Sequence, residues 1–146
     1  MNIKTLRQTW LMKAIDILRH DFNQIGETFP GEIDILVEYP GQGYQIFWLG
    51  SHRITDNRCY IFINPTVDGL LALDTLVHEL VHAAVFKTEG HGHGERFHYV
   101  AKAIGLDDRG IYAGAEESLL KRLREIQETL GSYPVDCLEG LGNDRR

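Results

Sequence analysis

The sequence predicts an α+β domain, because a helical pattern is followed by strand patterns and then by further helical patterns. Apolar residues recur at helical spacing over residues 5–20 and 116–130, whereas residues 33–37 place alternate apolar side chains on one face, as in a strand. A third signal is a pair of histidines four residues apart within an apolar stretch around residue 80. We therefore expect an N-terminal helix, a sheet of at least three strands, a central helix and C-terminal helices.

The size and composition indicate one soluble globular domain. The chain has 146 residues, of which 43% are hydrophobic and 25% charged, and this is enough apolar material for a sizeable core. We expect a single domain over residues 1–134 and a C-terminal tail over residues 135–146. The formal net charge of -6 argues against attraction of the whole protein to nucleic acid or to an anionic membrane.

The N-terminal region and the cysteines predict a cytoplasmic protein. Lys4, Arg7 and Lys13 lie near the start, and no apolar run there is long enough for a signal peptide or a membrane-spanning segment. Cys59 and Cys137 neither form a metal-ligand spacing nor suggest a disulfide framework. We expect Cys59 to be a small core residue on a strand.

The N-terminal half is expected to contain one helix and three strands. The helix covers about residues 5–20, and its apolar face consists of Leu6, Trp10, Leu11, Ala14, Ile15 and Leu18. The first strand covers residues 33–37. The turn residues 40–43 favour a hairpin between this strand and a second strand over residues 44–49. Residues 58–64 are rich in β-branched and aromatic side chains and form the third expected strand.

The C-terminal half is expected to be helical. The central helix begins near Asp68 or Asp74 and contains no proline. A shorter helix follows a glycine- and histidine-rich segment and ends near Gly105, and a last helix runs over residues 116–130. The residues after Gly131 are expected to pack loosely.

The central helix carries the pattern HExxH. Its two histidines, His78 and His82, lie four residues apart and therefore project from the same helix face at a separation that suits metal ligands. Glu79 follows the first histidine and can reach a metal-bound water without ligating the metal. This arrangement is typical of zinc hydrolases.

A third protein ligand must come from outside the motif. The segment 90–97, Gly-His-Gly-His-Gly-Glu-Arg-Phe, offers two histidines a short distance downstream. The extended metzincin pattern is excluded, because it requires glycine and histidine where this chain has Val85 and Thr88. A thermolysin-like site would take Glu116 or Glu117, although acidic residues at this position are also common at helix N-termini.

The motif and its surroundings resemble the SprT-like metalloproteases. The segment HELVHA is followed by GHGHGERF and AKAIGL, and the family's pattern joins HExxH to a downstream His-Gly-x-x-Phe. The segments IFINP and LGSYP are also similar to bacterial and phage members, so that the resemblance covers about residues 60–134. It implies a minimal zincin-like domain in which Phe97 anchors the helix after the loop. We expect no C-terminal zinc ribbon, because Cys137 is the one cysteine downstream.

The resemblance also implies roles for individual residues. His78 and His82 match the first two metal ligands, and Glu79 matches the catalytic glutamate. His93 matches the histidine of His-Gly-x-x-Phe and is the expected third ligand. The repeated Gly-His sequence leaves His91 as an alternative third ligand or as a group behind the ligands.

The implied function is that of a zinc-dependent metalloendopeptidase. A Zn²⁺ ion would activate a water molecule, with Glu79 as the general base, and a polypeptide substrate would lie along an edge of the sheet. Tyr112 is a candidate hydrogen-bond donor to the oxyanion. The alternative is a non-catalytic, zinc-stabilised binding module associated with protein or DNA. DNA-bound protein substrates are suggested by the family resemblance alone, and no membrane partner is expected.

Overall fold

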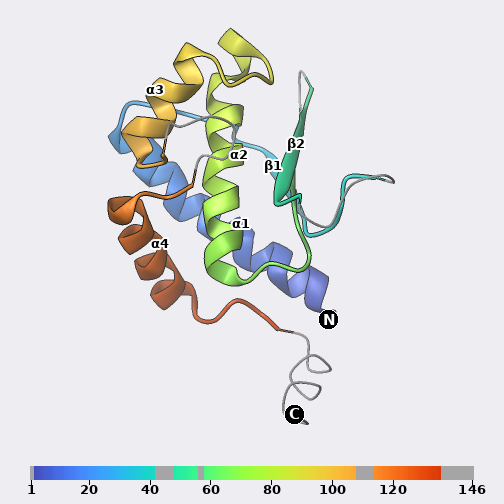
Figure 1. Ribbon diagram of the computed structural model, residues 1–146. Helices are drawn as coiled ribbons and strands as arrows, with labels where there is room; N and C mark the ends of the chain where they lie inside the picture. The colour runs from blue at the N-terminus through green and yellow to red at the C-terminus, as the bar shows by residue number, and fades with distance from the viewer. Residues whose placement is uncertain (1, 42–47, 56–57, 108–113, 136–146) are drawn as a thin grey trace.

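The computed structural model describes residues 2–41, 48–55, 58–107 and 114–135 and forms an α+β domain, as predicted (Figure 1). In chain order the elements are α1 (Ile3–Gln24), β1 (Ile33–Leu36), β2 (Gly50–Ile54), β3 (Cys59–Ile63), α2 (Gly69–Glu89), α3 (Glu95–Ile104) and α4 (Glu117–Leu130). The predicted helices and the predicted first and third strands are therefore confirmed, and α1 extends beyond the predicted bounds at both ends.

Helix α2 is the central element of the domain, since it contacts α1, α3, α4, β2 and β3 (Figure 1). It starts where Asp68, one of the two predicted start residues, accepts a 2.9 Å hydrogen bond from the backbone N–H of Leu71. By length and composition α2 could also cross a membrane, but 67% of its most apolar window is buried inside the domain. That burial is what a core helix of a folded domain requires.

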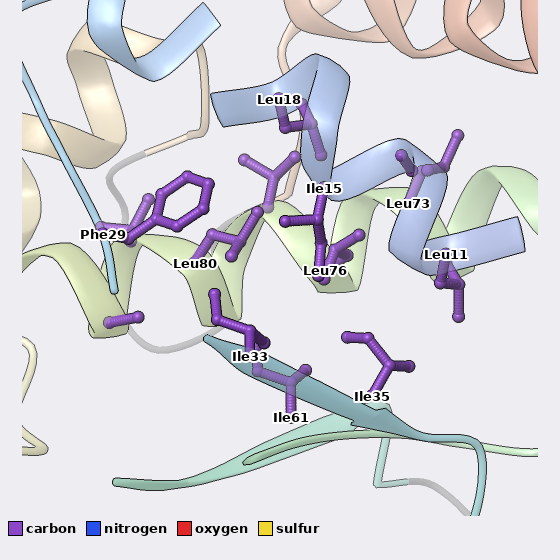
Figure 2. Packing of buried hydrophobic residues seen from close by; sticks show 14 of the residues in the cluster. Leu11, Ile15, Leu18, Phe29, Ile33, Ile35, Ile61, Leu73, Leu76 and Leu80 are labelled. Carbon is purple, nitrogen blue, oxygen red and sulfur yellow. The ribbon is translucent and has the colours of Figure 1, made fainter. Parts of the chain in front are cut away.

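The core lies between the two long helices and the sheet. Figure 2 shows apolar side chains from α1, α2, β1 and β3 pointing into the same space. The residues labelled there are Leu11, Ile15, Leu18, Phe29, Ile33, Ile35, Ile61, Leu73, Leu76 and Leu80. Cys59 is 1% exposed on β3, as predicted for a small core residue. The apolar side chains of α1 and α2 are thus buried in one core, in a layer of helices packed on the sheet.

The sheet has the strand order β1-β3-β2. Strand β1 pairs with β3 in parallel, with Ile35 opposite Ile61, and β2 pairs with β3 antiparallel, with His52 opposite Ile61. Strand β2 therefore has one edge free of strand partners among the described residues. This edge flanks α2, whose contacts with β2 become important below.

The predicted hairpin between the first two strands falls mostly on residues 42–47, which lie outside the described residues. Among the described residues, β2 starts at Gly50, after the predicted range of 44–49, and its antiparallel partner is β3. Burial explains the observed strand order: four of the five residues of β3 are buried, so this strand takes the centre, whereas the polar sequence of β2 suits an edge.

The residues directly after α4 pack more tightly than predicted. Tyr133 is 7% exposed, and its ring meets that of Trp10 edge-on at a centroid distance of 5.0 Å. Arg7 donates hydrogen bonds to the backbone carbonyls of Pro134 and Pro65, at 2.7 and 2.9 Å. The expectation of loose packing is therefore wrong for 132–134, because an aromatic ring and a buried arginine secure this segment to α1.

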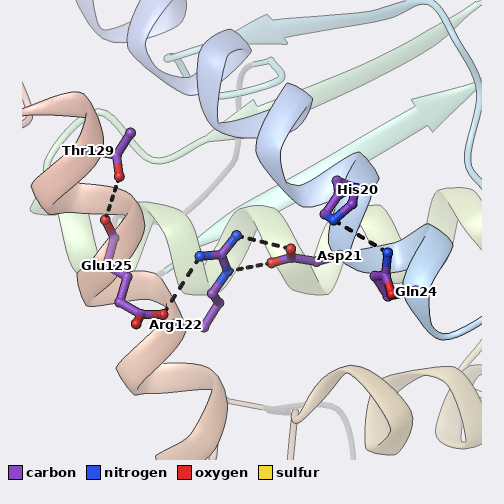
Figure 3. A network of polar contacts seen from close by, with 6 residues as sticks. All are labelled: His20, Asp21, Gln24, Arg122, Glu125 and Thr129. Atoms are coloured by element: carbon purple, nitrogen blue, oxygen red, sulfur yellow. Dashed lines mark hydrogen bonds and ion pairs between the residues drawn. The ribbon is translucent and has the colours of Figure 1, made fainter.

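An ion pair connects the first and last helices. Arg122 on α4 donates two hydrogen bonds to the carboxylate of Asp21 on α1, at 2.8 and 3.1 Å (Figure 3). The carboxylate of Asp21 raises the pKa of Arg122, mainly through this hydrogen bonding. The pair helps to fix α4 against α1, on the side of α2 that lies away from the sheet.

Candidate metal and catalytic site

Three histidine rings converge beside the middle of α2. His78 and His82 lie on the helix, and His93 lies in the loop that leads to α3. The Nε2 atom of His93 is 3.1 Å from Nε2 of His82 and 3.5 Å from Nε2 of His78. The three residues form one of two groups in the described part of the chain whose ligand atoms could hold a metal ion.

The spacing of these nitrogens fits a tetrahedral metal ion such as zinc. Ligands about 2.0–2.1 Å from a tetrahedral zinc ion are separated by roughly 3.3–3.4 Å. The observed separations of 3.1 and 3.5 Å lie on either side of this value. A hydrogen bond could satisfy only one of the two contacts, because a neutral histidine has at most one proton on Nε2.

Burial favours the neutral, metal-binding form of His82 and His93. His82 is 3% exposed, and desolvation, followed by the neighbouring histidines, lowers its pKa to about 2. Burial also lowers the pKa of His93. The Nδ1 atom of His82 is buried and has no hydrogen-bond partner among the described residues. These two rings therefore offer lone pairs rather than positive charge.

The loop before α3 returns His93 to the helix. Glu89, the last residue of α2, accepts a hydrogen bond from the backbone N–H of Arg96 in the first turn of α3. Gly94 permits this closure, because a Cβ atom there would collide with the Glu89 carboxylate. The side chain of Glu89 and the close approach of the backbone at Gly94 thus hold the two ends of the loop together.

Phe97 packs against the histidine cluster. It is fully buried, and its ring centroid lies 4.5 Å from that of His82, 4.7 Å from that of His93 and 5.3 Å from that of His78. One side chain of α3 therefore contacts all three rings.

Glu79 lies beside the cluster with a partner that the sequence did not indicate. Glu79 is 5% exposed, and its Oε1 is 2.8 Å from Nδ1 of His52 on β2. The second group able to hold a metal ion consists of His52, Glu79 and His82. The sequence around His52 lacks the apolar alternation of a strand, so that neither β2 nor this contact was predicted. The one sequence feature that could have indicated the contact is a histidine two residues after Gly50.

The two loop histidines have different surroundings. His93 faces His78 and His82, whereas Nδ1 of His91 is 2.8 Å from Nε2 of His52. The ring of His91 also lies close to that of Phe86, with a centroid distance of 5.0 Å. His91 is therefore placed beside His52 rather than among the converging nitrogens.

The remaining candidates lie away from the cluster or outside the description. Glu116 precedes α4 and Glu117 begins it, and neither belongs to a metal-competent group in the described ranges. Both are better explained as acidic residues at a helix N-terminus. Tyr112 lies outside the described residues.

A pocket of about 670 Å³ opens beside these side chains. One wall is β2 and the segment before it, and the other is α2, with His91 and His93 closing one end. Trp48, Leu49 and Leu71 are exposed apolar side chains on its lining. Asp74 also lines it and accepts a 3.2 Å hydrogen bond from the backbone N–H of Ala115, while burial raises the pKa of its carboxyl.

Comparison with known proteins places these elements in a family. Residues 48–115 match the SprT-like family, and this segment runs from β2 through α3 and contains every histidine and glutamate of the cluster. No curated protein and no solved structure matches the chain. The matched segment and the resemblance of its motif agree, and over this segment the chain is similar to the SprT-like family.

Proposed function

We propose that this protein is a zinc-dependent metalloendopeptidase. The observation that carries the proposal is the convergence of three imidazole nitrogens beside a buried glutamate, within a pocket that is open to solvent. A structural zinc site usually closes its fourth position with a protein ligand, whereas three histidines leave that position open. The match of residues 48–115 to the SprT-like family supports the same class of activity.

His78, His82 and His93 would hold the zinc ion. A zinc ion supplies Lewis acidity, which lowers the pKa of a water at its open position from near 16 toward about 7 and polarises the scissile carbonyl. Glu79 accepts the proton of the attacking water and then transfers it to the leaving amine. Its burial beside the pocket keeps competing solvent away from the carboxylate.

The pocket suits an extended polypeptide. Strand β2 is an edge strand and forms one wall, so a substrate backbone can pair with it as an added strand. Trp48, Leu49 and Leu71 line the same pocket and would contact apolar substrate side chains. Unfolded segments of other proteins present both features.

The test is cleavage of an unfolded protein, such as reduced casein, by the zinc-loaded protein and by Glu79→Gln. We expect Glu79→Gln to retain one zinc ion per chain and to lose cleavage by at least about 10²-fold, because it loses the general base. The matched control is Glu117→Gln, an exposed acidic residue on α4, which should cleave normally. Zinc binding without Glu79-dependent cleavage would instead favour a binding module.

A further inference from the structure

The buried carboxylate of Glu79 is held from one side. Nδ1 of His52 lies 2.8 Å from Oε1, and because a carboxylate only accepts hydrogen bonds, this nitrogen carries the proton and donates it. The His52 side chain is 10% exposed and that of Glu79 is 6% exposed, so the bond is largely shielded from water. The bond fixes one oxygen of Glu79 and the orientation of the whole carboxylate.

The fold brings His52 to this position through matched spacings of strand and helix. A Cβ atom at Gly50 would collide with Cγ2 of Thr75, so the absence of a side chain there lets β2 lie directly against α2. His52 is two residues further along the same face of the strand, about 6.6 Å away. Glu79 is four residues beyond Thr75, about 6 Å along the helix. The two elements therefore meet at 50 with 75 and at 52 with 79.

His91 completes a chain of three side chains. Nδ1 of His52 donates to Glu79, and its other ring nitrogen, Nε2, lies 2.8 Å from Nδ1 of His91, so that one of these two nitrogens donates to the other. The two rings are stacked, with centroids 4.9 Å apart and planes inclined by 25°. Both ring nitrogens of His52 thus have partners, and its orientation is fixed from both sides.

We propose that His52 is a positioning residue for Glu79, and that His91 in turn orients His52. The inference rests on the proposed function, because Glu79 acts there as the base. Both ring nitrogens of His52 have partners, so neither is free to act on the scissile bond. His52 instead holds the carboxylate of Glu79 in the orientation that receives the proton. His52 on β2 and His91 in the loop therefore orient Glu79 rather than bind the metal.

The kinetic test compares two replacements at His52 in the zinc-loaded protein. His52→Leu removes the donor, and we expect kcat to fall about 10- to 100-fold with KM and zinc content unchanged, as for other residues that orient a catalytic group. His52→Asn places an amide N–H near the position of Nδ1, and it should restore most of the loss. Arg53→Gln, on the same strand but with an exposed side chain, is the control and should match the wild type.

Equal losses in His52→Leu and His52→Asn, or a normal kcat in His52→Leu, would overturn the inference. His91→Leu should lower kcat less than His52→Leu, because its effect passes through one more hydrogen bond. Loss of zinc from His52→Leu would also contradict the inference, since it would assign His52 to the metal.

A second readout does not depend on cleavage. In protein labelled with ¹⁵N-histidine, NMR should identify His52 as the Nδ1–H tautomer, and Glu79→Gln should shift this signal but leave that of His20 on α1 unchanged. If the wild type cleaves nothing, the proposed function fails, and the tautomer still decides whether His52 holds Glu79. An Nε2–H tautomer of His52 overturns the inference whatever the result of the cleavage assay.

Discussion

Two sets of side chains share the pocket but differ in what their nitrogens face. In the metal cluster, formed by His78, His82 and His93, the Nε2 atoms face one another at 3.1 and 3.5 Å. In the base chain, formed by Glu79, His52 and His91, each contact at 2.8 Å joins one donor to one acceptor. The first arrangement could hold a metal ion, whereas the second pairs its own donors and acceptors.

The two sets also lie at different depths. The metal cluster contains the buried His82, whereas the base chain ends at the exposed His91. They touch where the rings of His52 and His82 lie 4.5 Å apart. The comparison teaches that the residue type does not determine the role of a histidine, because the neighbours of each ring nitrogen decide whether it binds metal or orients a carboxylate.

The largest expected effect separates the two loop histidines. His93→Ala removes one of three converging nitrogens, and we expect it to lose most of its zinc and all measurable cleavage. His91→Ala should retain most of its zinc, because its ring faces His52. Metal analysis after gel filtration measures both variants. Equal loss of zinc in the two variants would break the distinction between the metal cluster and the base chain.

A smaller effect is expected from replacing Phe97, whose ring packs against the metal cluster. Phe97→Ala leaves a cavity under three histidine rings, and we expect the free energy of unfolding to fall by about 3–5 kcal/mol. Zinc affinity should fall as well, because the rings lose their support. Denaturant titration and competition with a zinc chelator provide the two measurements.

The matched control for Phe97 is Tyr99→Ala. This residue lies on the same helix and is 61% exposed, so neither its stability nor its zinc affinity should change appreciably. A loss of stability in Tyr99→Ala as large as that in Phe97→Ala would show that α3, rather than the buried ring, supports the cluster.

The smallest expected effect concerns the base chain. Gly50→Ala places a Cβ against Cγ2 of Thr75 and 3.1 Å from the carbonyl oxygen of Phe62, so β2 must move away from α2. We expect a loss of about 1–3 kcal/mol in stability. Cleavage should fall while zinc is retained, because the displaced strand carries His52 and not a ligand of the metal cluster.

A second substitution sharpens this result. Thr75→Ser removes the colliding Cγ2 and should recover part of the activity of Gly50→Ala in the double variant. Gly31→Ala is the control, because a Cβ atom there meets nothing within 4 Å. Zinc loss in Gly50→Ala would contradict the independence of the two sets.

Much of the scaffold was predictable because its signals are local. The helical spacing in α1, the capping residue Asp68 and the apolar run of β3 each depend on neighbours within a few residues, and the structure bears them out. The observed pairing of β1 and β2 with β3 was not predicted, because a turn signal at 40–43 indicates a change of direction but does not select the partner strand. The burial of four of its five residues makes β3 the central strand with which both other strands pair.

The sequence by itself determined the spacing of His78, Glu79 and His82, because four residues of helix place two rings on one face whatever surrounds them. Only the tertiary structure decided which loop histidine faces that pair and which residue holds Glu79. His52 and Glu79 are 27 residues apart in the chain and meet at 2.8 Å because a glycine in an edge strand allows close packing on the helix. Such a contact depends on packing between elements, and packing is not encoded in local spacing.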